Sequence, residues 1–219
     1  MNITHAREEI VTGDKLEAIF ARQKELMSKY HHIEVKSGLL QTPDCPVNLD
    51  DRRGQARLKD FAWRTTEELA EALDAREDAL HFQEELVDAL HFFTELTILS
   101  GHEPQDISIY HFGKVEDNIL ENLFIKANKY INDYEYQRPI SRELMDFIIE
   151  LGMMCNTLKN KPWKQSQMIT DKGEFRERLM TAWLRFIQIL ISAGLDAEQT
   201  CGLYLKKSQV NKFRQRTNY

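Results

Sequence analysis

The chain has 219 residues, of which 42% are hydrophobic and 29% charged, and its formal net charge is −6. This composition supports a buried core in one large domain or two small ones, and the negative charge disfavours nucleic acid as the main partner. The sequence contains no apolar run near 18 residues and opens with no basic-then-apolar signal pattern, so we expect a cytoplasmic protein. Glycine (9) and proline (5) are scarce and helical periodicity dominates, which predicts an all-α fold.

The predicted helices begin with residues 14–31, where Leu16, Ile19 and Phe20 form an apolar stripe. Residues 33–54 are rich in glycine, proline and Asp/Asn clusters, which indicates a long loop of the kind that often has a function, such as folding over a substrate. The other helices are predicted at 55–75, 78–100, 105–130, 142–159 and 174–193, with a last one that starts at a capping box of Asp196 and Gln199 and ends near 213.

Two acidic pairs, Glu68-x-x-Glu71 and Glu85-x-x-Asp88, lie on the second and third predicted helices. Residues three apart share a helix face, and apolar neighbours place these carboxylates near an apolar surface, where an unpaired ionised carboxylate is costly. A hard cation would remove that cost, and Mg²⁺ typically binds carboxylates together with substrate phosphates. Thirteen residues separate Glu71 from Glu85, enough for a helix hairpin that brings the pairs together. The alternative is a solvated acidic stripe.

This arrangement of Glu-x-x-Glu, a short linker and Glu-x-x-Asp resembles the signature of the all-α nucleotide pyrophosphohydrolases. That superfamily includes the dimeric dUTPases, the MazG-type enzymes and the dCTP/dUTP pyrophosphatase of T-even phages. The resemblance implies a helical homodimer and a site that holds two or more Mg²⁺ ions, with Mn²⁺ as an alternative, on Glu68, Glu71, Glu85 and Asp88. It also implies that water attacks the α-phosphorus and that Glu68 orients or deprotonates this water.

The resemblance extends to residues that contact the base and sugar. His91-Phe92 is similar to the Glu-x-x-Asp-x-x-His-Phe run of dUTPases and phage members. Dimeric dUTPases carry a Gln-x-x-Leu-Asn stretch on the first helix, and here the corresponding residues are Gln23, Leu26 and Met27. Met27 stands at the Asn position, so the choice of base stays open. We assign Gln23, His91 and Phe92 to base and sugar, and Trp63 to the same substrate-binding set.

The chain ends Lys207-x-x-x-Asn211-x-x-Arg214-Gln215-x-x-Asn218-Tyr219. This closely resembles the Lys-x-x-x-Asn-x-x-Arg-Gln-x-x-Gly-Tyr ending of dUTPases and the T-even phage enzyme. Lys207 and Arg214 can neutralise phosphate charge that the metals do not, and Asn211 and Gln215 offer amide donors and acceptors. Tyr219 completes the substrate-binding set. A basic helix end that complements the helix dipole would explain the cations but not the spacing.

An internal repeat relates residue n to residue n + 93. The run Ile98-Leu99-Ser100-Gly101 corresponds to Ile191-Ser192-Ala193-Gly194. We interpret residues 1–219 as one domain that contains an acidic metal-binding repeat at about 55–130 and a degenerate second repeat at about 141–219.

In the second repeat, Arg178 and Thr181 stand where Glu85 and Asp88 stand in the first, which predicts one metal site per chain. The run Lys161-Pro162-Trp163-Lys164 resembles a Lys-x-Trp-Lys run of the dUTPases and the phage enzyme, but it lies in the second repeat, and its role is left open.

The predicted function is Mg²⁺-dependent hydrolysis of dUTP to dUMP and pyrophosphate. Two enzymatic alternatives are a dCTP/dUTP pyrophosphatase of the phage type, acting in the host cytoplasm if the chain is phage-encoded, and a MazG-like nucleoside triphosphate pyrophosphohydrolase. A non-catalytic helical scaffold is disfavoured because all four acids are intact. Uracil and cytosine differ in hydrogen-bond donors and acceptors at two ring positions, and the sequence does not decide between them.

Overall fold

The computed structural model describes residues 3–133, 138–159, 161, 163, 165 and 169–216. In this part of the chain there are eight α-helices, one short 3₁₀ helix and no strand, which confirms the all-α prediction. The elements are η1 (Ile3–His5), α1 (Lys15–Ser37), α2 (Arg52–Asp74), α3 (Ala79–Leu99), α4 (Pro104–Phe112), α5 (Ile119–Asp133), α6 (Ile140–Thr157), α7 (Lys172–Ser192) and α8 (Ala197–Arg216).

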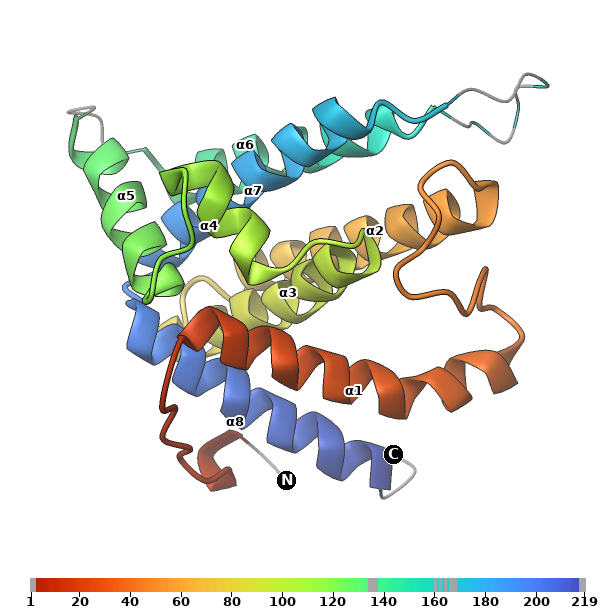
Figure 1. The fold of residues 1–219 in the computed structure, drawn as a ribbon. Helices are drawn as coiled ribbons and strands as arrows, with labels where there is room; N and C mark the ends of the chain where they lie inside the picture. Colours follow the sequence, from red (N-terminus) through yellow and green to blue (C-terminus); the bar gives the residue numbers. More distant parts are fainter. Residues whose placement is uncertain are drawn as a thin grey trace.

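The long helices pack in pairs that form three tiers (Figure 1). Helices α6 and α7 lie side by side in one tier, α2 and α3 form the middle tier, and α1 and α8 form the third. Helix α3 contacts α2, α1, α8 and α7, so it is covered on most sides. A helix in this position is expected to be apolar around much of its circumference, as the sequence of α3 is.

Aromatic side chains fix α3 against the tier of α6 and α7. The ring of Phe93 lies 5.2 Å from that of Phe147 on α6, and 4.9 Å and 5.7 Å from those of Trp183 and Phe186 on α7. The indole Nε1 of Trp183 donates a hydrogen bond to the hydroxyl of Thr97 at 3.0 Å. Each buried aromatic contributes about 2–3 kcal/mol of hydrophobic free energy. Helix α3 is therefore a rigid element from which side chains can be positioned.

The first helix is longer than predicted, and the loop after it is shorter. Helix α1 continues beyond residue 31 to Ser37 and ends where Gly38 adopts a left-handed conformation with φ 72°. Its last turns are held by a contact distant in sequence, because Arg57 on α2 pairs with Glu34 at 3.2 Å. Arg57 also donates to the carbonyl of Thr42 at 2.7 Å, which ties the shortened loop to α2.

The prediction of a single helix at 105–130 is wrong, because the structure has two helices there, α4 and α5. Helix α4 ends at Gly113, which has φ 76°, a conformation that glycine adopts without steric cost. The turn that follows is fixed by Ser108, whose hydroxyl donates to the carbonyl of Lys114 and accepts from the backbone N–H of Glu116. The predicted capping box before α8 is confirmed: the backbone N–H groups of Asp196 and Gln199 each donate to the other residue's side chain.

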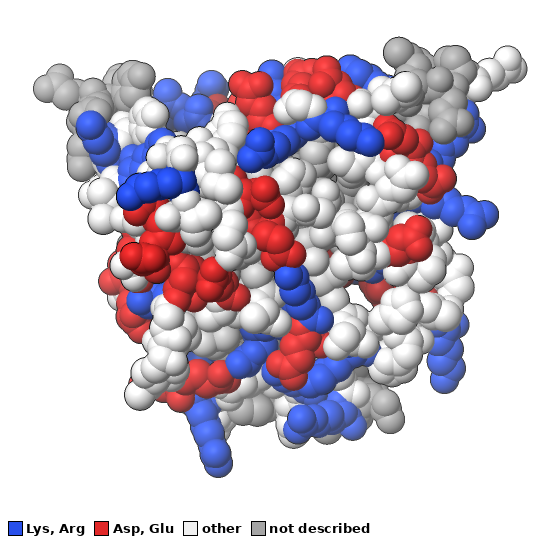
Figure 2. Space-filling model, in the orientation of Figure 1, with Lys and Arg blue, Asp and Glu red and all other residues white. Residues whose placement is uncertain are grey.

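The surface charges are mixed in sign. On the face shown in Figure 2, acidic and basic side chains are interspersed, without the continuous basic surface that tracks a nucleic-acid backbone. No single helix in the described ranges is long and apolar enough to cross a membrane, although the bent pair α7 and α8 meets the length and composition test together.

Candidate active site

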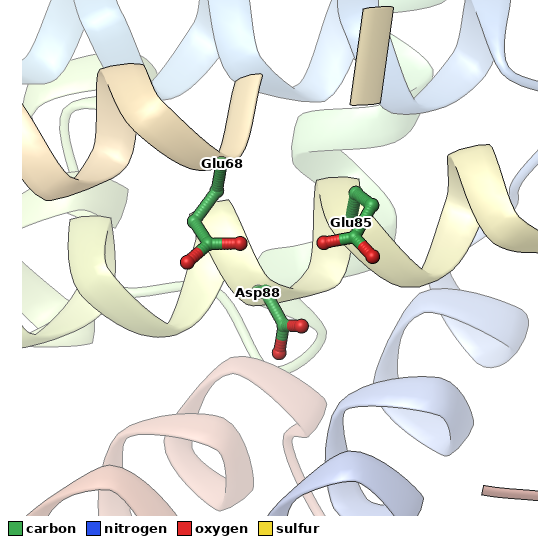
Figure 3. Close-up of side chains that lie close together, drawn as sticks. All are labelled: Glu68, Glu85 and Asp88. Carbon is green, nitrogen blue, oxygen red and sulfur yellow. The ribbon is translucent and has the colours of Figure 1, made fainter. Parts of the chain in front are cut away.

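Three carboxylates meet between α2 and α3. Each of Glu68, Glu85 and Asp88 offers an oxygen, and these oxygens all lie within 4.8 Å of one another. Glu68 comes from α2 and the other two come from α3, and Asp88 points toward α8 (Figure 3). All three residues are partly buried. The helix hairpin predicted from the spacing therefore brings members of the two acidic pairs together.

The charges in this acidic cluster destabilise one another. Burial and the charges of Asp88, Glu71 and Glu85 raise the pKa of Glu68 to about 8. Burial also raises the pKa of Asp88 to about 6, although the Lys207 ammonium, 2.5 Å from its Oδ2, acts in the opposite direction. Close carboxylates in a partly desolvated site are a donor set that suits a hard divalent cation. The residues present thus fit a Mg²⁺ site.

Two of the predicted site residues, Glu71 and Trp63, lie outside the acidic cluster and the cavity beside it. Glu71 is exposed and is not one of the three clustered acids, but its charge contributes to the raised pKa of Glu68. Trp63 is 62% exposed, does not line the cavity beside the cluster, and donates a hydrogen bond from Nε1 to Glu67 at 2.7 Å. Their assignments to metal and substrate remain predictions.

We expect Glu68→Gln to stabilise the metal-free protein at alkaline pH. The folded-state pKa of about 8 exceeds the ordinary value of 4.5, so the folded chain binds the proton more tightly and loses stability as pH rises from 4.5 to 8. Glutamine removes this loss. The gain at pH 8.5 should be about 1–3 kcal/mol, discounted for solvent screening, and should shrink at pH 5. Thermal unfolding in EDTA at both pH values tests this, and equal shifts at both would contradict it.

The acidic cluster adjoins a cavity of about 340 Å³ that extends along α3. The cavity is lined by Gln23, Leu26, Tyr30, Glu34, Phe61, Arg64, Glu68, Asp88, His91, Phe92, Glu95, Lys207, Asn211 and Arg214. These residues come from α1, α2, α3 and α8, so the first helix, the third helix and the C-terminal segment, each with members of the predicted substrate set, contribute to one cavity.

Cationic and aromatic side chains share the cavity wall. Lys207 and Arg214 come from α8, and Arg64 comes from α2. The Arg64 guanidinium lies 4.8 Å from the ring centre of Phe61 and 5.8 Å from that of Phe92. Cations near aromatic faces are attracted electrostatically, and a planar guanidinium can also bind phosphate. The wall can therefore contact both a flat base and an anionic tail.

A buried hydrogen-bond network joins α1, α3 and α8 at the cavity wall. The Gln23 side chain donates from Nε2 to Glu95 Oε2 at 2.8 Å. Its Oε1 accepts from the Tyr204 hydroxyl at 2.6 Å and lies 2.9 Å from His91 Nδ1, which must donate to this oxygen. The His91 ring stacks on Tyr204 with centres 3.7 Å apart, and burial lowers the pKa of His91 to about 3. His91 is therefore neutral, with its proton on Nδ1.

The remaining residues singled out from the sequence lie at the end of the chain and in the run 161–164. The Gln215 amide lies beside Tyr30 and acts to lower the pKa of that phenol, although burial raises it overall. Tyr219 lies outside the described residues, as do Pro162 and Lys164 of the 161–164 run. Trp163 is 77% exposed.

Sequence reasoning missed Arg64, Glu95 and Tyr204. Arg64 lies four residues before Glu68 and Glu95 four after His91, so helical spacing from residues already singled out was the available signal. Tyr204 is fully buried, and it enters the network only because α8 packs against α1 and α3.

A second cavity, of about 390 Å³, adjoins α5, α6 and α7. Its lining on α7 consists of Thr181, Leu184, Arg185 and Gln188. These lie 93 residues after the four α3 residues of the first cavity, Asp88, His91, Phe92 and Glu95. Arg178, which corresponds to Glu85, forms an ion pair with Glu150 at 3.1 Å. The internal duplication itself stays a prediction.

An all-helical bundle with clustered carboxylates beside a cation-lined cavity has the features of the all-α nucleotide pyrophosphohydrolases. The family model for dUTPase matches residues 72–219, and the chain belongs to that family. The match includes Glu85, Asp88 and the whole of α8 but begins after Glu68 and Glu71, near the end of α2. No curated protein and no solved structure matches the chain.

Proposed function

We propose that this protein hydrolyses dUTP to dUMP and pyrophosphate with the help of Mg²⁺. The observation that supports this most directly is that the acidic cluster adjoins a cavity that is also lined by cationic and aromatic side chains. A nucleoside triphosphate needs these three features, because it carries a metal-binding polyphosphate, further negative charge and a flat base.

Glu68, Glu85 and Asp88, assisted by Glu71, would hold the metal. Bound Mg²⁺ supplies a more acidic water ligand and neutralises charge on the phosphate oxygens. The Glu68 carboxylate, beside the metal, would accept a proton from the water that attacks the α-phosphorus, as the sequence resemblance implies. Lys207 and Arg214, with Asn211 and Gln215, would bind the remaining phosphate oxygens.

The base would lie further along α3. Phe61 and Phe92 line this part of the cavity and offer apolar faces for a pyrimidine ring. Gln23 and His91 would form hydrogen bonds with its edge, as the sequence resemblance implies. A homodimer and a cytoplasmic location belong to the same proposal. The phage-type dCTP/dUTP pyrophosphatase is the second candidate, because an acidic side chain, Glu95, lines the base end.

Pyrophosphate release can be measured with dUTP and with each of the four canonical deoxyribonucleoside triphosphates. We expect release from dUTP. Attack at the α-phosphorus breaks the bond between the α-phosphorus and the bridging oxygen, so a reaction in ¹⁸O-labelled water should place the label in dUMP and none in pyrophosphate. Mass spectrometry of both products measures this. Label found in pyrophosphate, or release of orthophosphate, would contradict the proposed reaction.

A further inference from the structure

Glu95 is an acidic residue in a buried position that neither catalysis nor metal binding explains. Its side chain is 7% exposed and contributes to the wall of the first cavity. It follows Asp88 by seven residues on α3, a rise of about 10 Å along the helix axis. This places Glu95 at the base end when the triphosphate is held at the acidic cluster.

The hydrogen bond that Glu95 accepts from Gln23 fixes the orientation of the Gln23 amide. Glu95 accepts from Gln23 Nε2, which turns Gln23 Oε1 toward the Tyr204 hydroxyl and the N–H of His91 Nδ1. The His91 ring lies behind Gln23, with its Nε2 buried and the Tyr204 backbone beside the ring. The Glu95 carboxylate is therefore an acceptor in the wall of the cavity.

Uracil and cytosine differ in what they present to such an acceptor. Cytosine has an amino group at position 4, which is a donor, whereas uracil has a carbonyl oxygen there, which is an acceptor. An ionised carboxylate only accepts hydrogen bonds, and Glu and Asp are the side chains that pair with the cytosine amino group. A protonated carboxyl gains one donor and can bind the uracil carbonyl.

We propose that Glu95 reads position 4 of the pyrimidine, so that the chain hydrolyses dCTP as well as dUTP and favours dCTP when Glu95 is ionised. This inference rests on the proposed function, because it concerns the base end of the same substrate site. Glu95 is then a specificity-determining residue, and it takes no part in the attack on phosphorus.

The surroundings of Glu95 bring its titration near neutral pH. Burial and the charge of Glu34 raise its pKa to about 7, against the opposing hydrogen bond from Gln23 and the charges of Arg57 and Arg64. The charge of Glu95 also acts on three other titratable groups, Tyr30, Cys45 and Tyr204. The carboxyl is protonated below this pKa, where it can donate to uracil, and ionised above it, where it accepts from cytosine. The preference for dCTP over dUTP should therefore rise with pH.

The test measures kcat/KM for dCTP and for dUTP between pH 6 and pH 8.5. The two substrates share the triphosphate, so the ionisation of the metal ligands and phosphates cancels in the ratio. Hydrogen bonds to a charged group predict that the dCTP/dUTP ratio rises roughly 10- to 100-fold over this range. In Glu95→Gln the ratio should be independent of pH and closer to one, because an amide both donates and accepts.

Glu34→Gln is the matched control. It neutralises a second carboxylate in the wall of the same cavity, one that pairs with Arg57 instead of Gln23. The rise in the ratio should persist in this variant, but with its midpoint at lower pH, since the charge of Glu34 raises the pKa of Glu95. An identical loss of pH dependence in both variants would assign the effect to general electrostatics and overturn the role of Glu95.

Binding of dCMP and dUMP by calorimetry separates this inference from the reaction proposed above. At pH 8.5 the wild-type chain should bind dCMP more tightly than dUMP, and Glu95→Gln, with a circular dichroism spectrum like wild type, should lose that difference. If no triphosphate is hydrolysed but this pattern is found, the proposed reaction fails and the assignment of Glu95 stands. If Glu95→Gln keeps the wild-type binding difference and pH profile, the assignment of Glu95 is wrong.

Discussion

Replacing Asp88 with asparagine is expected to reduce kcat for dUTP by at least about 10²-fold, the order of loss seen when one charge-stabilising group is removed from an active site. Asp88 supplies one oxygen of the acidic cluster and is also the partner of Lys207, at 2.5 Å. The substitution weakens metal binding and leaves the Lys207 ammonium without its carboxylate. Metal titration followed by pyrophosphate release measures both effects. Excess EDTA should abolish the wild-type activity in the same assay.

Glu84→Gln provides the control for this experiment. Glu84 lies on the same helix and undergoes the same change of charge, but it is not part of the acidic cluster. Its activity and metal dependence should stay within a few-fold of wild type. If Asp88→Asn and Glu84→Gln lose activity equally, the loss reflects the net charge of α3, and the assignment of the metal site is wrong.

A chain that ends at Asn211 is expected to fold and to bind Mg²⁺, but to lose roughly 10²-fold in kcat/KM for dUTP and for dCTP alike. The truncation removes Arg214 from the cavity wall and also removes Gln215, but it leaves α2 and α3 complete. Because the lost groups would contact phosphate, which both substrates share, the ratio between the two substrates should not change. Circular dichroism and steady-state kinetics with both substrates measure these expectations.

Two point variants locate this effect within α8. Arg214→Gln should reproduce most of the loss, whereas Lys212→Gln should not, because Lys212 forms its ion pair with Glu25 on α1 and does not line the cavity. A truncated chain that hydrolyses dUTP at the wild-type rate would refute a phosphate role for the segment. A truncation that alters only the base preference would move these residues to the base end.

Local spacing accounts for the parts of the site that were predicted from sequence. Glu85 and Asp88 are one turn apart on a helix, and the linker length places Glu68 opposite them, so no long-range information was needed to expect the cluster. Lys207 and Arg214 were predicted from the resemblance of the C-terminal pattern to dUTPases, and both line the cavity. The break at Gly113 was missed because glycine alone does not end a helix; the hydrogen bonds of Ser108 fix the turn there.

The missed residues depend on how separate helices pack. Glu95 could not be distinguished from an exposed helical glutamate until α1 placed Gln23 against it. Tyr204 became part of the buried hydrogen-bond network only through its bond to Gln23, 181 positions away in sequence. Arg64 was one cation among 29 until the rings of Phe61 and Phe92 were found beside it. Periodicity identifies the buried face of a helix, but it does not say which other helix covers that face.

The pairing of α1 with α8 has a consequence for synthesis on the ribosome. Helices α2 and α3 emerge early, but the cavity also needs side chains from α8, the last helix of the bundle. Contacts between such distant segments form late, because closing long stretches of chain costs entropy before any contact is gained. A nascent chain therefore carries the acidic hairpin without the complete cavity, and its uncovered apolar faces are the surface that a chaperone would bind. We therefore expect the proposed hydrolysis only after α8 has docked against α1 and α3.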